Sequence, residues 1–172
     1  MPTHQAPYPR FYIGGTVDVE VVQQARIKFQ AAKRHEHFLS RGMKHLFETL
    51  ENEDNFSKQV VDTWLRNEEN IERMAPGRTV ELKAHAPIRI NSLSHPVTLQ
   101  RGIREEEGIS IWIPLQEWNK ENGCMFGDTV IRPGEYLALS GVEPVTFPAS
   151  KGGALIIWFF LQLPSTLRSV ES

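Results

Sequence analysis

The sequence has a single cysteine, Cys124, among its 172 residues. One cysteine cannot close a disulfide within the chain, and it cannot build a zinc site alone. A reducing compartment is the simplest environment for such a chain, and we therefore expect a cytoplasmic protein.

Long apolar runs are also missing. The most apolar stretch, residues 154–161, is far shorter than the roughly 20 residues that a membrane-spanning helix needs. Residues 1–12 contain Pro7, Pro9 and Arg10 but no apolar run of signal-peptide length. We therefore expect neither export nor a membrane anchor.

No excess of charge of one sign is present. The chain has 19 Lys and Arg against 21 Asp and Glu, for a net charge of -2. Proteins that bind nucleic acid gain most of their affinity by neutralising phosphates, and they usually show a basic excess or face. Acidic residues accompany the one basic cluster, so we interpret it as a solvated helix face and do not expect nucleic acid as a partner. The cluster consists of Lys33, Arg34, His35, His37, Arg41, Lys44 and His45.

A self-sufficient catalytic motif is absent as well. The serines lie outside any nucleophile elbow, and Gly152-Gly153 lacks the pattern of a phosphate loop. The glutamates at 105–107 give no sign of the opposed environments that separate the pKa values of a catalytic carboxylate pair. His35 and His37 are two residues apart, so on a helix they would not face one metal ion. Hydrolase and nucleotidase chemistry is therefore not indicated.

Apolar residues from Val22 onward follow a 3-4 spacing that predicts one long helix over residues 22–50, capped by Thr16 or Asp18. A helix of this length would overhang a small domain, so we consider a homodimer formed through its apolar stripe. The alternative is a helix that breaks at Gly42 and packs entirely on its own sheet. The residues expected in the dimer contact are Leu39, Met43, Leu46 and Leu50.

A second helix is predicted over residues 55–74, with Trp64 on its buried side and Glu69 on its wet side. Ala75-Pro76-Gly77 ends it, because proline cannot continue a helix and glycine permits the turn.

After Gly77 the pattern changes to short β-type runs separated by Pro and Gly, which is typical of sandwiches and barrels. The predicted fold is α+β, with N-terminal helices packed on a C-terminal antiparallel jelly roll or double-stranded β-helix. We expect one domain, with an extended arm (1–15), a helical part (16–75), a β part (78–164) and a tail (165–172). The predicted strands are 79–83, 88–91, 97–100, 109–113, 129–131, 136–139, 145–147 and 154–162.

One family resemblance lies in the β part, over residues 108–160. A strand at 109–115 runs into Gln116-Glu117-Trp118, and the turn Arg132-Pro133-Gly134-Glu135 precedes a closing segment at 145–159. This succession resembles the double-stranded β-helix of the iron(II)/2-oxoglutarate oxygenases, especially the prolyl-hydroxylase and phytanoyl branches. The resemblance implies a jelly roll whose interior can hold a ligand.

The sequence departs from that family at its metal ligands. The family binds iron through a His-x-Asp pair and a distal histidine, and a basic residue grips 2-oxoglutarate. Here His95-Pro96-Val97 stands at the pair, Glu143 stands where the distal histidine belongs, and Gly152 or Gly153 replaces the basic residue. We therefore expect no metal and no cofactor.

A competing resemblance concerns the β-core of the dUTPase and dCTP-deaminase family. Residues 133–139, followed by Glu143, Val145 and Phe147-Pro148, resemble that core. That family then requires a serine-rich, arginine-containing phosphate motif, whereas residues 156–162 here are hydrophobic.

The functional hypothesis is binding of a small molecule or peptide by an oxygenase-like jelly roll with a degenerate metal site. A non-redox isomerase or cyclase could use His95 and Glu143 as a proton-transfer pair. The alternatives are a structural or regulatory protein that dimerises through the long helix, and an iron oxygenase with unusual ligands. The expected ligand-binding side chains are Arg89, Trp112, Arg132 and Trp158.

Overall fold

The computed structural model describes residues 11–15, 17–35, 46–52, 55–99, 108–125, 128–140 and 145–163. The helices of this part of the chain are α1 (Val19–Ala31), α2 (Phe56–Arg66) and α3 (Glu68–Met74). Its strands are β1 (Phe11–Gly14), β2 (Arg34–His35), β3 (Phe47–Leu50), β4 (Glu81–Ile90), β5 (Val97–Leu99), β6 (Gly108–Pro114), β7 (Tyr136–Ser140), β8 (Val145–Phe147) and β9 (Leu155–Gln162).

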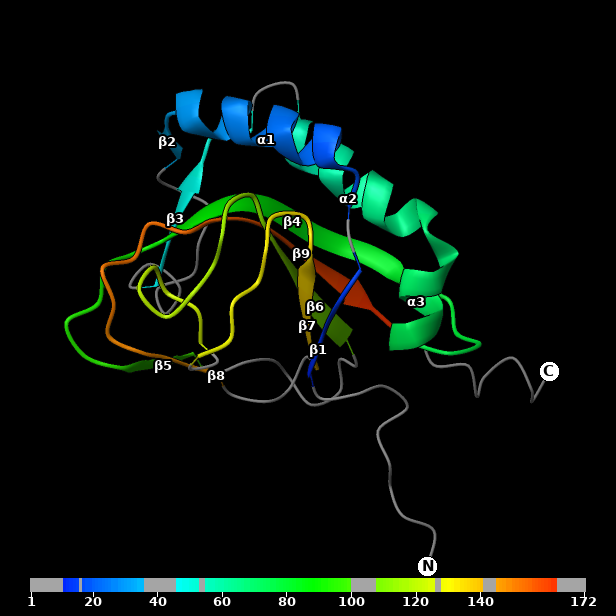
Figure 1. Cartoon of the computed structure of the whole chain (residues 1–172). Helices are drawn as coiled ribbons and strands as arrows, with labels where there is room; N and C mark the ends of the chain where they lie inside the picture. Colours follow the sequence, from blue (N-terminus) through cyan, green and yellow to red (C-terminus); the bar gives the residue numbers. More distant parts are fainter. Residues whose placement is uncertain are drawn as a thin grey trace, which may run out of the picture.

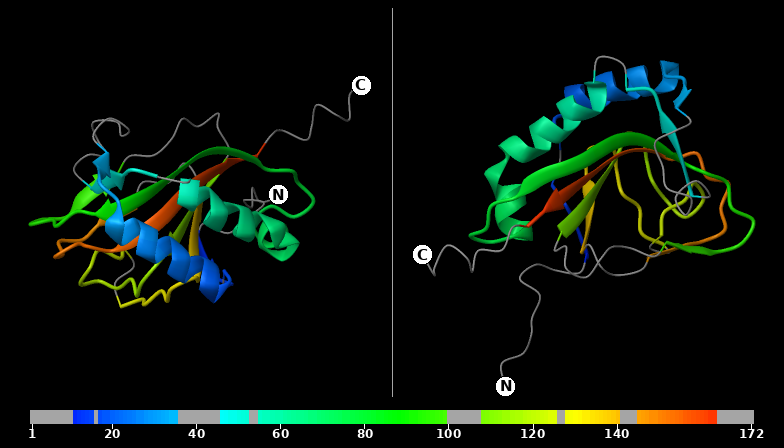
Figure 2. Two further views of the ribbon diagram at one scale, coloured as in Figure 1. Left: turned by 90° about the horizontal axis from the view of Figure 1, so that it is seen from above. Right: turned by 180° about the vertical axis from the view of Figure 1, so that it is seen from behind.

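The described strands form two antiparallel sheets. The larger has the order β1-β7-β6-β9-β4-β3-β2, and β5 pairs with β8 in the smaller. The helices lie on one side of the larger sheet, and β5 and β8 lie on its other side (Figures 1 and 2). A mixed architecture of helices and an antiparallel jelly roll, as predicted, is confirmed in outline.

Two apolar clusters fill the two faces of the larger sheet. Successive side chains of a strand point to opposite faces, so Ile111 and Ile113 of β6 pack against the helices while Trp112 points into the jelly roll. Every residue of β6 is buried, as expected for a central strand covered on both faces. Both layers therefore depend on β6 and its neighbours.

The prediction of one long first helix is wrong. Helix α1 ends at Ala31, because the next residue, Ala32, adopts an extended backbone. Leu46 and Leu50, placed in the dimer contact, are 0% and 3% exposed inside the core, and Phe47–Leu50 is strand β3. Leu39, Met43 and Gly42 lie outside the described residues. Because α1 ends at Ala31, the homodimer hypothesis loses the long helix on which it rested.

The second predicted helix is confirmed as two pieces, α2 and α3. Asn67, with φ -83° and ψ 98°, interrupts it and caps α3 by accepting a hydrogen bond from the N–H of Glu69. The described helix ends before the turn at Gly77, where φ is +68°. No helix in the described part of the chain is both long and apolar enough to span a membrane.

Three details of the strand prediction also change. The strands predicted at 79–83 and 88–91 are parts of one continuous strand, β4. At 129–131 there is only an isolated bridge, in which Ile131 pairs with Trp118. The segment at 11–14, placed in an extended arm, pairs with β7 as β1.

Trp64 of α2 anchors the helices to the sheet. Its ring meets the rings of Tyr136 and Phe159 edge to face, with centroids 5.4 and 5.3 Å apart, and it is 1% exposed. Glu69 of α3, by contrast, is exposed.

We expect Trp64→Ala to lower the free energy of unfolding by about 3–5 kcal/mol, because the buried indole leaves a cavity. Glu69→Ala, the matched surface control, should change it by no more than about 0.5 kcal/mol. Chemical denaturation followed by circular dichroism measures both values. Similar midpoints for the two variants would show that Trp64 does not anchor α2.

Candidate functional site

The smaller sheet supplies the wall of the jelly roll where the resemblance places the metal. Its inner face is apolar, because Val97 and Leu99 of β5 and Val145 and Phe147 of β8 pack against the interior cluster. Outside, the hydroxyls of Thr98 and Thr146 lie 2.8 Å apart.

Aromatic rings fill the interior. Trp112 and Trp118 stack with centroids 6.2 Å apart, and Phe47 and Phe147 close on Trp112 at 5.6 and 6.1 Å. The indole N–H of Trp112 donates to the Ser110 hydroxyl at 3.1 Å. Trp112, predicted to line a ligand pocket, is 2% exposed and is a core residue in this structure.

The other predicted site residues do not come together around a cavity. Trp158 is partly buried beside Trp112, its cross-strand neighbour. Arg89 forms an ion pair with Glu48, with Nη1 and Oε1 3.1 Å apart, and Arg132 is exposed in a turn before β7. His95 is exposed, and its Nδ1 lies 3.1 Å from the Ser94 hydroxyl. Glu143 lies outside the described residues.

The described residues do not fit an iron and 2-oxoglutarate site of the usual kind. They contain no group of three or more His, Cys, Asp or Glu side chains placed to hold a metal ion, and Val97 offers no lone pair. Gly152 and Gly153, at the position of the basic residue, have φ of +72° and +96°. A side chain is strained at both positions, and at Gly152 its Cβ would lie 2.5 Å from the backbone of Asn91.

A pocket lies on the helix side of the larger sheet, where β3 separates from β4. The pairing between these strands ends at Thr49↔Ile88. Pro87 is the next residue toward the start of β4, and it has no partner on β3 in this register. The N–H groups along a strand point alternately to its two neighbours. The N–H of Ile90 donates to the Ala154 carbonyl on the β9 side, and the N–H of Asn91 donates to the Leu46 carbonyl on the β3 side. Pro87 is therefore on the β3 side, where it has no N–H to donate.

The separating strands line an open pocket of about 350 Å³. This volume lies within the range typical of small-ligand sites. We call it the β3–β4 pocket; its lining residues are Thr49, Leu50, Glu51, Asn52, His85, Ala86 and Pro87.

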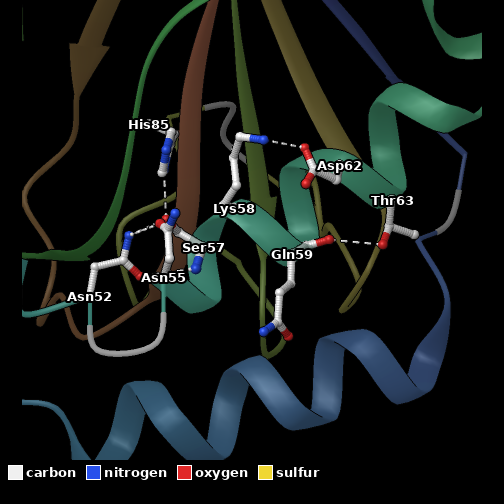
Figure 3. A network of polar contacts seen from close by, with 8 residues as sticks. All are labelled: Asn52, Asn55, Ser57, Lys58, Gln59, Asp62, Thr63 and His85. Carbon is white, nitrogen blue, oxygen red and sulfur yellow. Dashed lines mark hydrogen bonds and ion pairs between the residues drawn. The ribbon is translucent and has the colours of Figure 1, made fainter.

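A chain of hydrogen bonds connects this pocket to the start of α2 (Figure 3). The Asn52 side chain accepts from the Ser57 backbone N–H at 3.0 Å through Oδ1, and it donates to the Ser57 hydroxyl at 2.6 Å through Nδ2. Nδ1 of His85 lies 2.7 Å from the same hydroxyl. Ser57 is 0% exposed, so its hydroxyl is held entirely by protein groups.

These contacts fix the protonation of His85. The backbone bond sets which end of the Asn52 amide is the donor, so the Ser57 oxygen accepts from Asn52. Among the contacts of the described residues, Nδ1 of His85 is the acceptor that remains for the proton of this hydroxyl, so we assign Nδ1 as the acceptor. The imidazole is therefore neutral, with its proton on Nε2.

Electrostatics agrees with a neutral imidazole. Burial lowers the pKa of His85 below its usual value, the nearby Lys58 ammonium lowers it further, and the Asp62 carboxylate opposes them. Lys58 and Asp62 form their own ion pair one turn apart on α2, at 2.6 Å. Chemically, the pocket presents a neutral imidazole N–H donor rather than a cation.

Sequence reasoning missed His85 and Ser57. The available signal was Pro87, which stands between two strand-like runs and, inside a sheet, marks a place where pairing stops. The partnership of His85 with Ser57 spans 28 positions and needed the fold itself.

No protein-family model and no curated sequence matches this chain. Among solved structures, HygX from Streptomyces hygroscopicus, with nickel, 2-oxoglutarate and hygromycin B bound, matches with a TM-score of 0.60 and 11% identity, over 91% of this chain and 84% of HygX. A prolyl hydroxylase from Trichoplax adhaerens, in complex with a peptide fragment of hypoxia inducible factor, matches with a TM-score of 0.55 and 11% identity, over 95% and 87% of the two chains. The chain has an oxygenase-like jelly-roll fold.

EvdO2 from Micromonospora carbonacea var. aurantiaca, complexed with 2-oxoglutarate, also matches with a TM-score of 0.53 and 11% identity, over 91% of this chain and 86% of EvdO2. Sequence identity this low supports a shared fold and no shared function, because one fold hosts many functions. The oxygenase-like prediction is thus confirmed for the fold.

The lowered pKa of His85 predicts part of the pH dependence of stability. An unfolded histidine has a pKa of about 6.5, so as the pH falls the unfolded chain takes up this proton before the folded chain does. The contribution of His85 is fully present above pH 6.5 or so and is lost as the pH falls through the lower folded pKa.

We expect unfolding midpoints to fall from pH 7.5 to pH 5, and His85→Asn to make that fall shallower. His95→Asn, which removes an exposed histidine, is the control and should leave the slope unchanged. Equal slopes for wild type and His85→Asn would contradict the assignment.

Proposed function

We propose that this protein is a metal-independent binding domain on an oxygenase-like jelly roll, and that it binds a small molecule or peptide in the β3–β4 pocket. The observation that supports metal independence is the apolar inner face of the smaller sheet, where Val97 and Phe147 pack into the aromatic core. Because the interior is filled in this way, we place the ligand in the outer pocket that the described residues form between β3 and β4.

The structural neighbours support a binding role for the fold. HygX holds hygromycin B, and the Trichoplax prolyl hydroxylase holds a peptide. A jelly roll can keep such a role after its metal ligands are replaced. Proton transfer between His95 and Glu143, as in an isomerase or cyclase, stays a prediction.

The first prediction concerns metal. Protein purified without oxygen should retain no stoichiometric iron, and titration with Fe(II) and 2-oxoglutarate should give no saturable heat, because a valine stands where the carboxylate ligand belongs. Elemental analysis and calorimetry measure these outcomes. One tightly bound iron per chain, lost in His95→Ala, would overturn metal independence.

The second prediction concerns the place of binding. In a nuclear magnetic resonance screen of neutral water-soluble fragments, we expect bound fragments to shift the methyl signals of Leu50, whose side chain lies on the helix side of the sheet. The methyl signals of Val97 and Val145, inside the jelly roll, are the internal control and should not move. Shifts confined to the interior, or no shifts at all, would contradict the pocket.

A further inference from the structure

The polar groups of the β3–β4 pocket divide into those already used and those left for a ligand. Both hydrogens of the Asn52 amide are used, one by the Ser57 hydroxyl and one by Oδ1 of Asn55 at 3.1 Å. Nδ1 of His85 is used by Ser57. Among the described residues, no hydrogen bond or ion pair occupies the other ring nitrogen of His85 or the carboxylate of Glu51.

The two remaining groups are complementary in kind. Nε2 of His85 carries a proton and can only donate, whereas the Glu51 carboxylate can only accept. The rest of the lining includes the apolar residues Leu50, Ala86 and Pro87. A ligand for this pocket therefore needs an acceptor and a donor on an otherwise apolar body.

We propose that the β3–β4 pocket binds a small neutral ligand through an amide group, whose carbonyl accepts from His85 Nε2–H and whose N–H donates to Glu51. This inference rests on the proposed binding function and specifies its ligand class. An amide carries both a strong acceptor and a donor in one neutral planar unit.

Anionic ligands fit the same lining less well. A carboxylate would face Glu51, and the nearest lysine on α2, Lys58, is already engaged by Asp62 at 2.6 Å. Because His85 is neutral, it adds no positive charge for an anion. An ester keeps the carbonyl but lacks the N–H, so it would leave the Glu51 carboxylate without its hydrogen bond.

The test uses a simple primary amide with an apolar body, 3-methylbutanamide, as the probe, with the methyl ester and the free acid of the same carbon skeleton as matched analogues that contain no amide. Binding to the full chain is measured by chemical-shift titration at pH 7.5. We expect the amide to bind at least about tenfold more tightly than the ester or the acid, since a hydrogen bond to a charged group contributes that much or more.

Variants separate the two contacts. His85→Asn keeps an acceptor for Ser57 at the place of Nδ1 but removes the donor at Nε2, whereas His85→Gln places an amide N–H near Nε2. We expect amide affinity to fall about tenfold in His85→Asn and in Glu51→Ala, and to stay within a few fold in His85→Gln. Glu20→Ala, at an exposed position away from the pocket, is the control that should bind as the wild type does.

A readout on the wild type alone guards against a variant that fails to fold. The ¹⁵N shifts of histidine-labelled protein should show His85 as the neutral Nε2–H form at pH 7.5, and amide addition should shift Nε2. A proton on Nδ1, or a doubly protonated ring, would overturn the inference.

The remaining outcomes distinguish the inference from the proposed function. Other fragments shifting the pocket while every amide fails, or amide binding unaffected by both His85→Asn and Glu51→Ala, would overturn the amide assignment and leave the binding function standing. A pocket that no fragment shifts would overturn the function as well.

Discussion

The ladder between β4 and β9 is the constraint on which both layers of the molecule depend. It runs antiparallel from Glu81↔Gln162 to Arg89↔Leu155, and it fixes which face each β4 side chain takes. Ala86 and Ile88 point into the jelly roll and help to fill it. His85 is next to the inward-facing Ala86, so its side chain faces the helices, where Ser57 meets it.

The same ladder explains why one end of β4 is open. Because β9 supports β4 along nearly its full length, β3 needs to pair only with the last residues of β4, from Ile88 to Ile90. Pro87 removes a donor on that side without destabilising the β9 side. The separation of β3 is thus stable, and the cavity beside it is part of the fold.

The sequence predicted several strands of the β half well because these strands are short, apolar and close to a Pro or Gly. The runs at 136–139 and 145–147 appear as β7 and β8 with almost the predicted bounds. The helical stripe from Val22 failed beyond Ala31 because a 3-4 spacing of apolar residues also occurs by chance across a helix, a loop and a strand. Leu46 and Leu50 are apolar because they enter the core.

The candidate site was much harder to predict than the fold. The sequence predicts Arg89, Trp112 and Trp158 as ligand-binding residues because aromatic and basic side chains line many ligand sites, yet Trp112 is core and Arg89 is paired with Glu48. Composition cannot distinguish an aromatic core from an aromatic pocket. The distinction depends on whether opposing strands bring Phe47, Phe147 and Trp118 into the same space, which they do here.

The Asn52–Ser57–His85 chain has the residue types of a nucleophilic site, but its geometry serves a different purpose. A serine nucleophile needs an accessible oxygen and a histidine nitrogen that can take its proton during attack. Ser57 is 0% exposed and already accepts from Asn52, so no substrate carbon can reach its oxygen in this arrangement. The hydroxyl instead acts as a fixed donor that holds the imidazole in one tautomer, because the alternative would leave a buried hydroxyl proton without an acceptor. Ser57 is therefore a positioning residue, and the chemistry that it controls is the direction in which His85 presents its N–H.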